Sequence, residues 1–149
     1  MNIIDRFAAY AAAFEDAYAS DDWSKLDPFF TEDAVYDVVA EAPFATSIAG
    51  RESIKAYFKQ ICTVLDRRFD SRSVEMLTAP VDRGGAVWFR WAATYTLAGA
   101  PNLRMEGEET ALFAGDRMRR LEDRIAAETV RSTQTYLAEH DTKLKPLPA

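Results

Sequence analysis

Hydrophobic residues recur with a helical period at both ends of the chain. In the first such segment Phe7 and Phe14 lie on one face, and Asn2 precedes the pattern as a candidate N-cap. Spacings of three and four residues between apolar positions are typical of amphipathic helices. They predict helices over residues 2–20, 23–30 and 51–65, and another from about residue 128.

The middle of the chain alternates between apolar and polar residues, as half-buried strands do. Turn signals, DRGG, AGAPN and AGDR, divide this part of the chain. The predicted strands cover residues 34–39, 73–81, 86–97, 103–114 and 118–127. Because helices and strands are segregated along the sequence, the expected fold class is α+β, with helices covering one face of an antiparallel sheet. A length of 149 residues suits a single domain over 1–149.

The predicted strand over 86–97 has two unequal faces. One is apolar throughout, whereas the other combines Trp88 and Arg90 with alanine and threonines. A sheet with one face in water is expected to show a clean polar face there. We therefore expect both faces to be covered, the second by another subunit in a homodimer, although a thicker monomer core would produce the same pattern.

Two carboxylates interrupt apolar faces in the last two predicted strands. Glu109 lies on the face that carries Ala111, and Asp123 lies between Leu121 and Ile125. A three-residue turn at 115–117 would place Glu109 opposite Asp123, with Cβ atoms about 5 Å apart. A turn of two or four residues would instead bring Glu122 opposite Glu109.

A facing pair of carboxyl groups has distinctive chemistry. Two such groups in an apolar cavity do not both ionise at low cost, so one keeps its proton while the other acts as a base. This suits proton abstraction next to a carbonyl, or activation of water. Glu109 and Asp123 are therefore the candidate catalytic residues. Simpler alternatives are a solvated carboxylate, a helix cap, or a structural ion pair with Arg90.

Charge and composition narrow the possible partners. The net charge is -6, which gives no attraction to phosphate backbones or anionic membrane surfaces, so neither nucleic acid nor a membrane is expected as a partner. Cys62 and His140 are the only residues of their types, which excludes an intrachain disulfide and a usual zinc site. No metal and no organic cofactor are expected, and glycine-rich nucleotide motifs are absent. The N-terminal segment lacks an apolar signal region, which favours a cytoplasmic location.

Three segments carry a resemblance to a known family. FEDAYASDDWSKLDPFFTEDAVYDV, GRESIKAYF and LFAGDRMRRLEDRI resemble the SnoaL-like branch of the nuclear transport factor 2-like superfamily. The resemblance covers roughly residues 7–136. It implies a cone, in which a strongly curved antiparallel sheet wraps around helices packed on its concave face, with an apolar pocket in its mouth. It also implies a homodimer and a small apolar molecule as the ligand.

The residues at the catalytic positions of these related enzymes favour some of the possible activities over others. Ketosteroid isomerases have a tyrosine where this chain has Phe14 and a catalytic aspartate where it has Val38, which speaks against that activity. SnoaL-type cyclases and limonene-type epoxide hydrolases both have an aspartate that matches Asp123. The epoxide hydrolase triad is incomplete, because Arg90 lies near the arginine position but Ala92 occupies that of the second aspartate.

The resulting hypothesis is a cofactor-independent isomerase or cyclase acting on an apolar carbonyl compound. Asp123 is its predicted general acid/base, and Glu109 is the partner that holds a proton or a hydrogen bond. A non-catalytic ligand-binding or dimerisation module and a limonene-type epoxide hydrolase with an incomplete triad are the alternatives. The predicted substrate-binding residues are Phe14, Tyr18, Tyr36, Val38, Tyr57, Phe58, Arg90 and Leu121.

Overall fold

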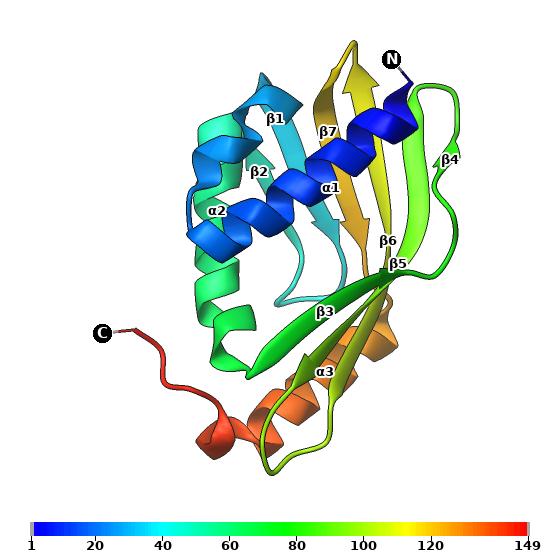
Figure 1. The fold of residues 1–149 in the computed structure, drawn as a ribbon. Helices are drawn as coiled ribbons and strands as arrows, with labels where there is room; N and C mark the ends of the chain where they lie inside the picture. Colours follow the sequence, from blue (N-terminus) through cyan, green and yellow to red (C-terminus); the bar gives the residue numbers. More distant parts are fainter. Residues whose placement is uncertain (1, 149) are drawn as a thin grey trace.

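A computed structural model describes residues 2–148 as a curved sheet with two long helices across its concave face (Figure 1). The helices are α1 (Ile3–Ser20), α2 (Arg51–Val64) and α3 (Ala127–Glu139), with 3₁₀ segments η1 (Trp23–Phe29), η2 (Asp66–Arg68) and η3 (Asp141–Lys143). Asn2 caps α1 as predicted, because its side-chain oxygen accepts from the Asp5 amide at 2.9 Å. None of the described helices has the length and apolar character to cross a membrane.

The sheet is built from seven strands. They are β1 (Phe30–Val39), β2 (Thr46–Ala49), β3 (Ser71–Met76), β4 (Val81–Asp82), β5 (Ala86–Thr96), β6 (Leu103–Ala114) and β7 (Arg117–Arg124). Their order is β2-β1-β7-β6-β5-β3, and β4 pairs with β5. The predicted α+β cone is confirmed, with one correction: β1 runs parallel to β7, so the sheet is mixed. No tight turn joins these two strands, so nothing local obliges them to be antiparallel.

β1 begins at Phe30, the last residue of the predicted helix and four residues before the predicted strand. Two further stretches of the sheet also differ from the sequence prediction. The short strand β2 lies in a segment expected to be loop, and its four residues are too few for alternation to show. The strand expected over 73–81 is divided into β3 and β4 by residues 77–80. Pro80 ends this interruption, and proline has no amide hydrogen to contribute to a sheet ladder.

The β6–β7 hairpin decides which residues face each other. Its turn holds two residues, 115–116, where three were expected. A bulge at Arg119 follows, since the pairing shifts between the neighbouring pairs of strand residues there. This extra residue restores the register, and Glu109 pairs with Asp123. The predicted pairing is therefore confirmed, although the predicted turn length was wrong.

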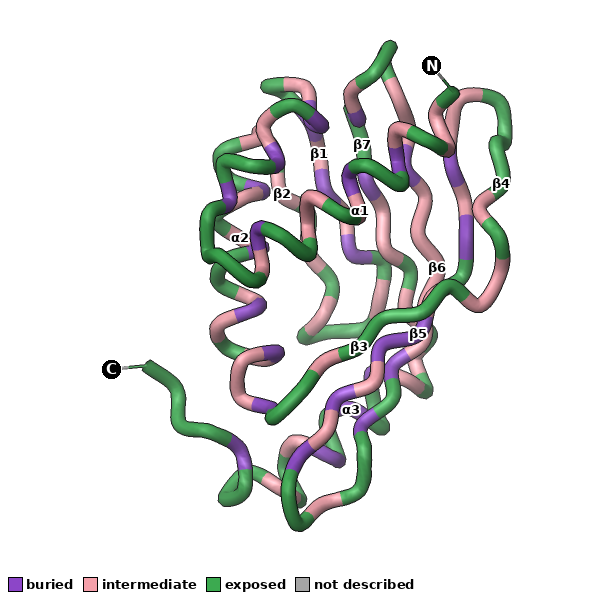
Figure 2. The backbone as a smooth tube through the Cα atoms, in the orientation of Figure 1, coloured by how far each residue is buried: buried purple, intermediate pink, exposed green. Residues whose placement is uncertain are grey.

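The buried side chains form two clusters. The larger lies between α1, α2 and the sheet, around residues such as Phe7, Phe30 and Phe58. The smaller lies where α3 meets one end of β5 and β6, and it includes Tyr95 and Tyr136. Buried positions are accordingly spaced along the strands behind α1 (Figure 2). This arrangement leaves room for a cavity between the helices and the centre of the sheet.

The convex face of the sheet covers its tryptophan with the chain's own side chains. Trp88 Nε1 donates to Glu108 Oε1 at 3.0 Å, and the Arg83 guanidinium carbon lies 3.9 Å from the centroid of the Trp88 ring. A tryptophan on this face therefore does not require a second subunit, and the homodimer stays a prediction.

Candidate functional site

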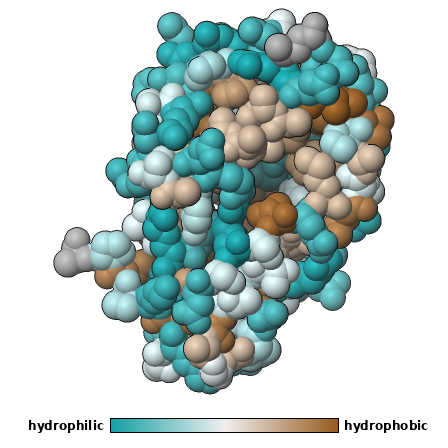
Figure 3. Space-filling view, in the orientation of Figure 1, coloured by the Kyte–Doolittle hydropathy of each residue, from teal (hydrophilic) through white to brown (hydrophobic). Residues whose placement is uncertain are grey.

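The concave face surrounds a cavity of about 780 Å³ between α1, α2 and the sheet. Apolar side chains gather around the hollow on this side of the molecule (Figure 3). This volume lies within the usual range for sites that bind small organic molecules. The cavity is therefore the candidate site.

Most of the predicted site residues line this cavity. They are Phe14, Tyr36, Val38, Tyr57, Phe58, Leu121, Glu109 and Asp123. The prediction was wrong for Arg90, which is exposed on the convex face opposite Glu108, because neighbouring positions of a strand point to opposite faces. It was also wrong for Tyr18, which is not part of the lining and packs its ring against Arg67 and Arg72.

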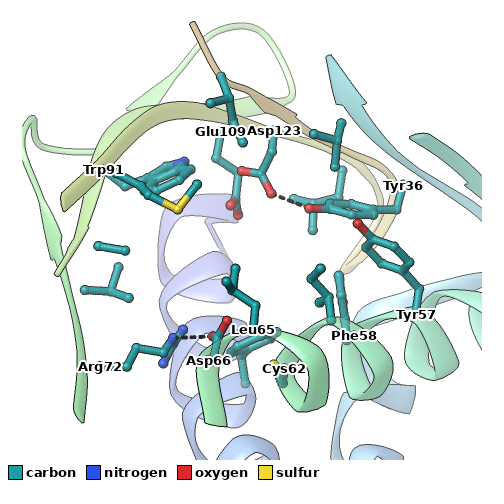
Figure 4. A pocket seen from close by; sticks show the side chains of 18 of the residues that line it. Tyr36, Tyr57, Phe58, Cys62, Leu65, Asp66, Arg72, Trp91, Glu109 and Asp123 are labelled. Atoms are coloured by element: carbon teal, nitrogen blue, oxygen red, sulfur yellow. Dashed lines mark hydrogen bonds and ion pairs between the residues drawn. The ribbon is translucent and has the colours of Figure 1, made fainter. Parts of the chain in front are cut away.

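Asp123 is held by a tyrosine from the neighbouring strand. Val38 pairs with Asp123 across β1 and β7, so Tyr36, two residues earlier, lies diagonally from it on the same face. Its hydroxyl donates to Asp123 Oδ2 at 2.5 Å (Figure 4). Burial raises the pKa of Asp123, and hydrogen bonding from Glu109 and Tyr36 opposes that increase. The hydrogen bond from Tyr36 therefore fixes one oxygen of Asp123 and favours its ionised form.

Glu109 completes what we call the carboxyl pair, Glu109 and Asp123. Its carboxyl group lies beside that of Asp123 and points into the cavity (Figure 4). Burial and the negative charge of Asp123 raise the pKa of Glu109 well above its ordinary value. Within residues 2–148 no cationic side chain forms an ion pair with either carboxyl group. Burial raises the pKa of both carboxyl groups, that of Glu109 more strongly, so a proton held by the pair is favoured on Glu109.

Trp91 is a lining residue that the sequence analysis missed. It lies on β5 opposite Gly107 of β6, and its indole crosses that glycine with the ring nitrogen directed toward the carboxyl pair (Figure 4). A Cβ atom on Gly107 would lie only 2.5 Å from Trp91 Cζ2. Trp91 Nε1 and Asp123 Oδ1 are both buried without a hydrogen-bond partner among the described residues. A glycine inside a strand, opposite a large aromatic residue, was the available signal.

A second polar cluster lies at another part of the cavity wall. Arg72 Nε is 3.0 Å from Asp66 Oδ2, and Arg72 Nη1 is 3.0 Å from Glu15 Oε2. The cluster joins α1, η2 and β3, and Figure 4 shows the Asp66–Arg72 contact apart from the carboxyl pair. Its members are distant in the sequence and break no apolar pattern, so sequence periodicity could not reveal it.

Asp66 makes the stability of the fold depend on pH. Burial raises its pKa from 3.8 to about 6, against the opposing charge of Arg72. The folded state thus binds this proton more tightly than the unfolded state. The stability that the proton contributes is complete below pH 4 and lost as pH rises from 4 to 6.

We predict that the unfolding free energy of the wild type falls by about 3 kcal/mol relative to that of Asp66→Asn over this interval, because folding raises the pKa of Asp66 from 3.8 to about 6. Urea denaturation of both proteins at pH 4 and at pH 6.5 measures the difference. An equal difference at the two pH values would show that Asp66 titrates alike in both states.

Cys62 supplies no reactive group. Burial raises the pKa of its thiol to about 12, so it stays protonated and behaves as the small buried hydrophobe that the sequence predicts. Among residues 2–148 no three His, Cys, Asp or Glu side chains are grouped to hold a metal ion.

Comparison with known families agrees with this architecture. A family model described as the SnoaL-like domain matches residues 11–128. The chain belongs to the SnoaL-like family. The matched segment includes both members of the carboxyl pair and most of the cavity lining. No curated protein matches the sequence significantly.

Solved structures share the fold of this SnoaL-like chain at low sequence identity. TerC, co-crystallised with polyporic acid, is 12% identical, with a TM-score of 0.64 over 89% of this chain and 98% of that one. An NTF2-like protein of unknown function from Burkholderia pseudomallei is 10% identical, with a TM-score of 0.64 over 91% and 98%. A protein with a ketosteroid isomerase-like fold from Catenulispora acidiphila, in complex with trimethylamine, is 18% identical, with a TM-score of 0.62 over 87% and 95%. These likenesses establish the fold alone.

Proposed function

We propose that this SnoaL-like protein binds a small apolar carbonyl compound in its cavity and catalyses proton transfer, as an isomerase or cyclase without a cofactor. The observation that carries the proposal is the carboxyl pair, which lies side by side in the wall of an apolar cavity of about 780 Å³. Such a pair offers an acid and a base side by side at neutral pH. The relative with polyporic acid supports the idea that this fold holds an organic ligand.

Each member of the pair has a role in the proposed step. Asp123 accepts a proton from the carbon next to the substrate carbonyl, and the electron pair of that C–H bond moves toward the carbonyl oxygen. Glu109 donates its hydrogen bond, and finally its proton, to that oxygen, which gives an enol. In an isomerisation, a conjugated enol takes the proton of Asp123 at another carbon and returns its O–H proton to Glu109. In a cyclisation, the enol carbon attacks a second carbonyl, whose oxygen takes the proton of Asp123, and the O–H proton again returns to Glu109.

Two neighbouring side chains support these roles. The hydroxyl of Tyr36 holds Asp123 Oδ2 and so orients the base. The aromatic walls, including Tyr57 and Phe58, exclude water and contact an apolar substrate. The epoxide hydrolase alternative loses support, because Arg90 is on the convex face and outside the cavity.

Hydrogen exchange of a simple ketone tests the proposed chemistry. We expect the protein to accelerate deuterium uptake at the CH₂ group of 1-(2-naphthyl)propan-2-one in D₂O, as followed by proton NMR. The matched control is Glu122→Gln, which removes one carboxylate from the adjacent position of β7, where Glu122 forms an ion pair with Arg124. This variant should keep the wild-type rate. A protein that changes the thermal stability profile in the presence of the ketone but leaves its exchange at the buffer rate would be a ligand-binding module instead.

A further inference from the structure

The charge of the carboxyl pair has no counter-charge in the described chain. Other carboxylates with little exposure lie beside a cation: Asp66 is 3.0 Å from Arg72, and Asp37 forms an ion pair with Arg120. The carboxyl pair instead meets neutral groups, the hydroxyl of Tyr36 and the indole of Trp91. A buried charge is costly unless it is paired. A positively charged ligand in the cavity would therefore complete the charge balance.

The rest of the cavity wall adds no positive charge to compensate. Arg72 faces the two carboxylates of Asp66 and Glu15, so the guanidinium there is already neutralised. The aromatic residues of the lining, among them Tyr36, Tyr57 and Trp91, are uncharged. Acidic side chains therefore outnumber basic ones in the cavity wall, which favours cations over anions there.

The aromatic walls reinforce this preference. Tyr36 and Tyr57 lie with ring centroids 5.8 Å apart at the carboxyl pair, and Phe58 lies 5.0 Å from Tyr36 (Figure 4). The faces of such rings carry partial negative charge and attract alkylammonium groups, whose methyl groups also contact the rings favourably. A carboxylate beside several aromatic rings thus matches an ammonium group that carries apolar substituents.

We propose that the cavity selects ligands in which a protonated amine is attached to an apolar body, over neutral and anionic ligands of the same shape. The ammonium N–H donates to the carboxyl pair, the alkyl groups contact Tyr36 and Tyr57, and the apolar body fills the space toward α1 and α2. This rests on the proposed function only in placing the ligand against the carboxyl pair. It does not depend on whether a ketone reacts there.

Three ligands that share a naphthylmethyl group test the proposal. N,N-dimethyl-1-(2-naphthyl)methanamine carries a dimethylammonium group, and 1-(2-naphthyl)propan-2-one carries an acetyl group. The anion of (2-naphthyl)acetic acid carries a carboxylate. Titration calorimetry at pH 7 should show the amine binding at least about tenfold more tightly than the ketone, and the carboxylate binding most weakly.

Two variants identify which charge causes the preference for the amine. Asp123→Asn combined with Glu109→Gln removes both acidic groups of the pair with little change in shape, and it should reduce the preference for the amine to within about twofold. Glu122→Gln removes one charge from the opposite face of the same strand and should preserve the preference. Equal affinity for amine and ketone in the wild type, or a preference that survives the combined replacement of Asp123 and Glu109, would overturn the proposal.

The possible results separate this inference from the proposed function. Exchange of the ketone without any preference for the amine would refute the charge selection and leave the proton-transfer chemistry standing. A clear preference for the amine without exchange of the ketone would do the reverse. Circular dichroism of each variant establishes that the comparison is made between folded proteins.

Discussion

Replacing Asp123 with asparagine should lower the rate of ketone proton exchange by about 10²- to 10⁴-fold and leave the fold equally stable or more stable. An amide has nearly the shape of a carboxyl group but cannot accept the proton, so the general base is lost. The free energy should not fall, because burial raises the pKa of Asp123, which means that the folded state disfavours the ionised carboxyl group. The rate is measured by NMR in D₂O and the stability by urea denaturation at pH 7.

The stability measurement separates a base from a structural group. If the hydrogen bond between Tyr36 and Asp123 stabilises the fold, replacing Asp123 leaves the buried hydroxyl of Tyr36 poorly satisfied. The free energy of unfolding would then fall by more than about 2 kcal/mol. A loss of stability of this size, with the exchange rate unchanged, would show that Asp123 has a structural role and not a catalytic one. Glu122→Gln again provides the matched comparison, since it alters the adjacent residue on the other face of β7.

The carboxyl pair shows what periodicity can and cannot supply. The two-residue alternation of β6 and β7 correctly placed Glu109 and Asp123 on apolar faces, because one face of the sheet is buried beneath the helices. The turn length was wrong, and only a compensating bulge at Arg119 preserved the pairing. A bulge depends on the local backbone conformation of both strands and leaves little trace in one sequence.

Arg90 and Tyr18 were wrongly assigned to the site because neither a family resemblance nor periodicity shows which side chains reach the cavity. Arg90 was assigned to the site through a resemblance, although its own strand alternation put it on the face of Trp88. Helical spacing placed Tyr18 on the apolar face of α1, but spacing does not show where along a helix a cavity ends. Pattern therefore identified the inner face, and only the three-dimensional contacts defined the extent of the cavity on it.

The sequence pattern did not predict Arg72 and Trp91 as site residues, and the reason is a different one. Arg72 is largely buried because Asp66 and Glu15 neutralise it, and these partners come from separate elements. Trp91 is one aromatic residue among several on an apolar face, and nothing in its own strand distinguishes it. What distinguishes it is the space left by Gly107 on the next strand, which is a property of the pairing.

The variant Gly107→Ala places a methyl group in that space, and it is the second change for which we expect a large effect. The added Cβ would lie 2.5 Å from Trp91 Cζ2 and 3.0 Å from the carbonyl oxygen of Arg124, and a backbone oxygen cannot turn aside. Alanine in a strand gains about 0.5–1 kcal/mol over glycine. Overpacking of this kind costs about 1–3 kcal/mol, so the overpacking wins and the variant is less stable. Urea denaturation measures the loss.

The double variant tests whether the indole is the cause. In Gly107→Ala the ring must leave its position beside the carboxyl pair, so the exchange of the ketone should slow together with the loss of stability. Trp91→Phe places a smaller ring there, and we expect Gly107→Ala to cost less in that background, with a coupling energy of about 1 kcal/mol or more. If Gly107→Ala costs the same in both backgrounds, the glycine serves the backbone of β6 instead. If the cost disappears with Trp91→Phe, the clash with the indole is its cause. The lack of a side chain at Gly107 on β6 then makes room for Trp91 of β5 beside Asp123 of β7.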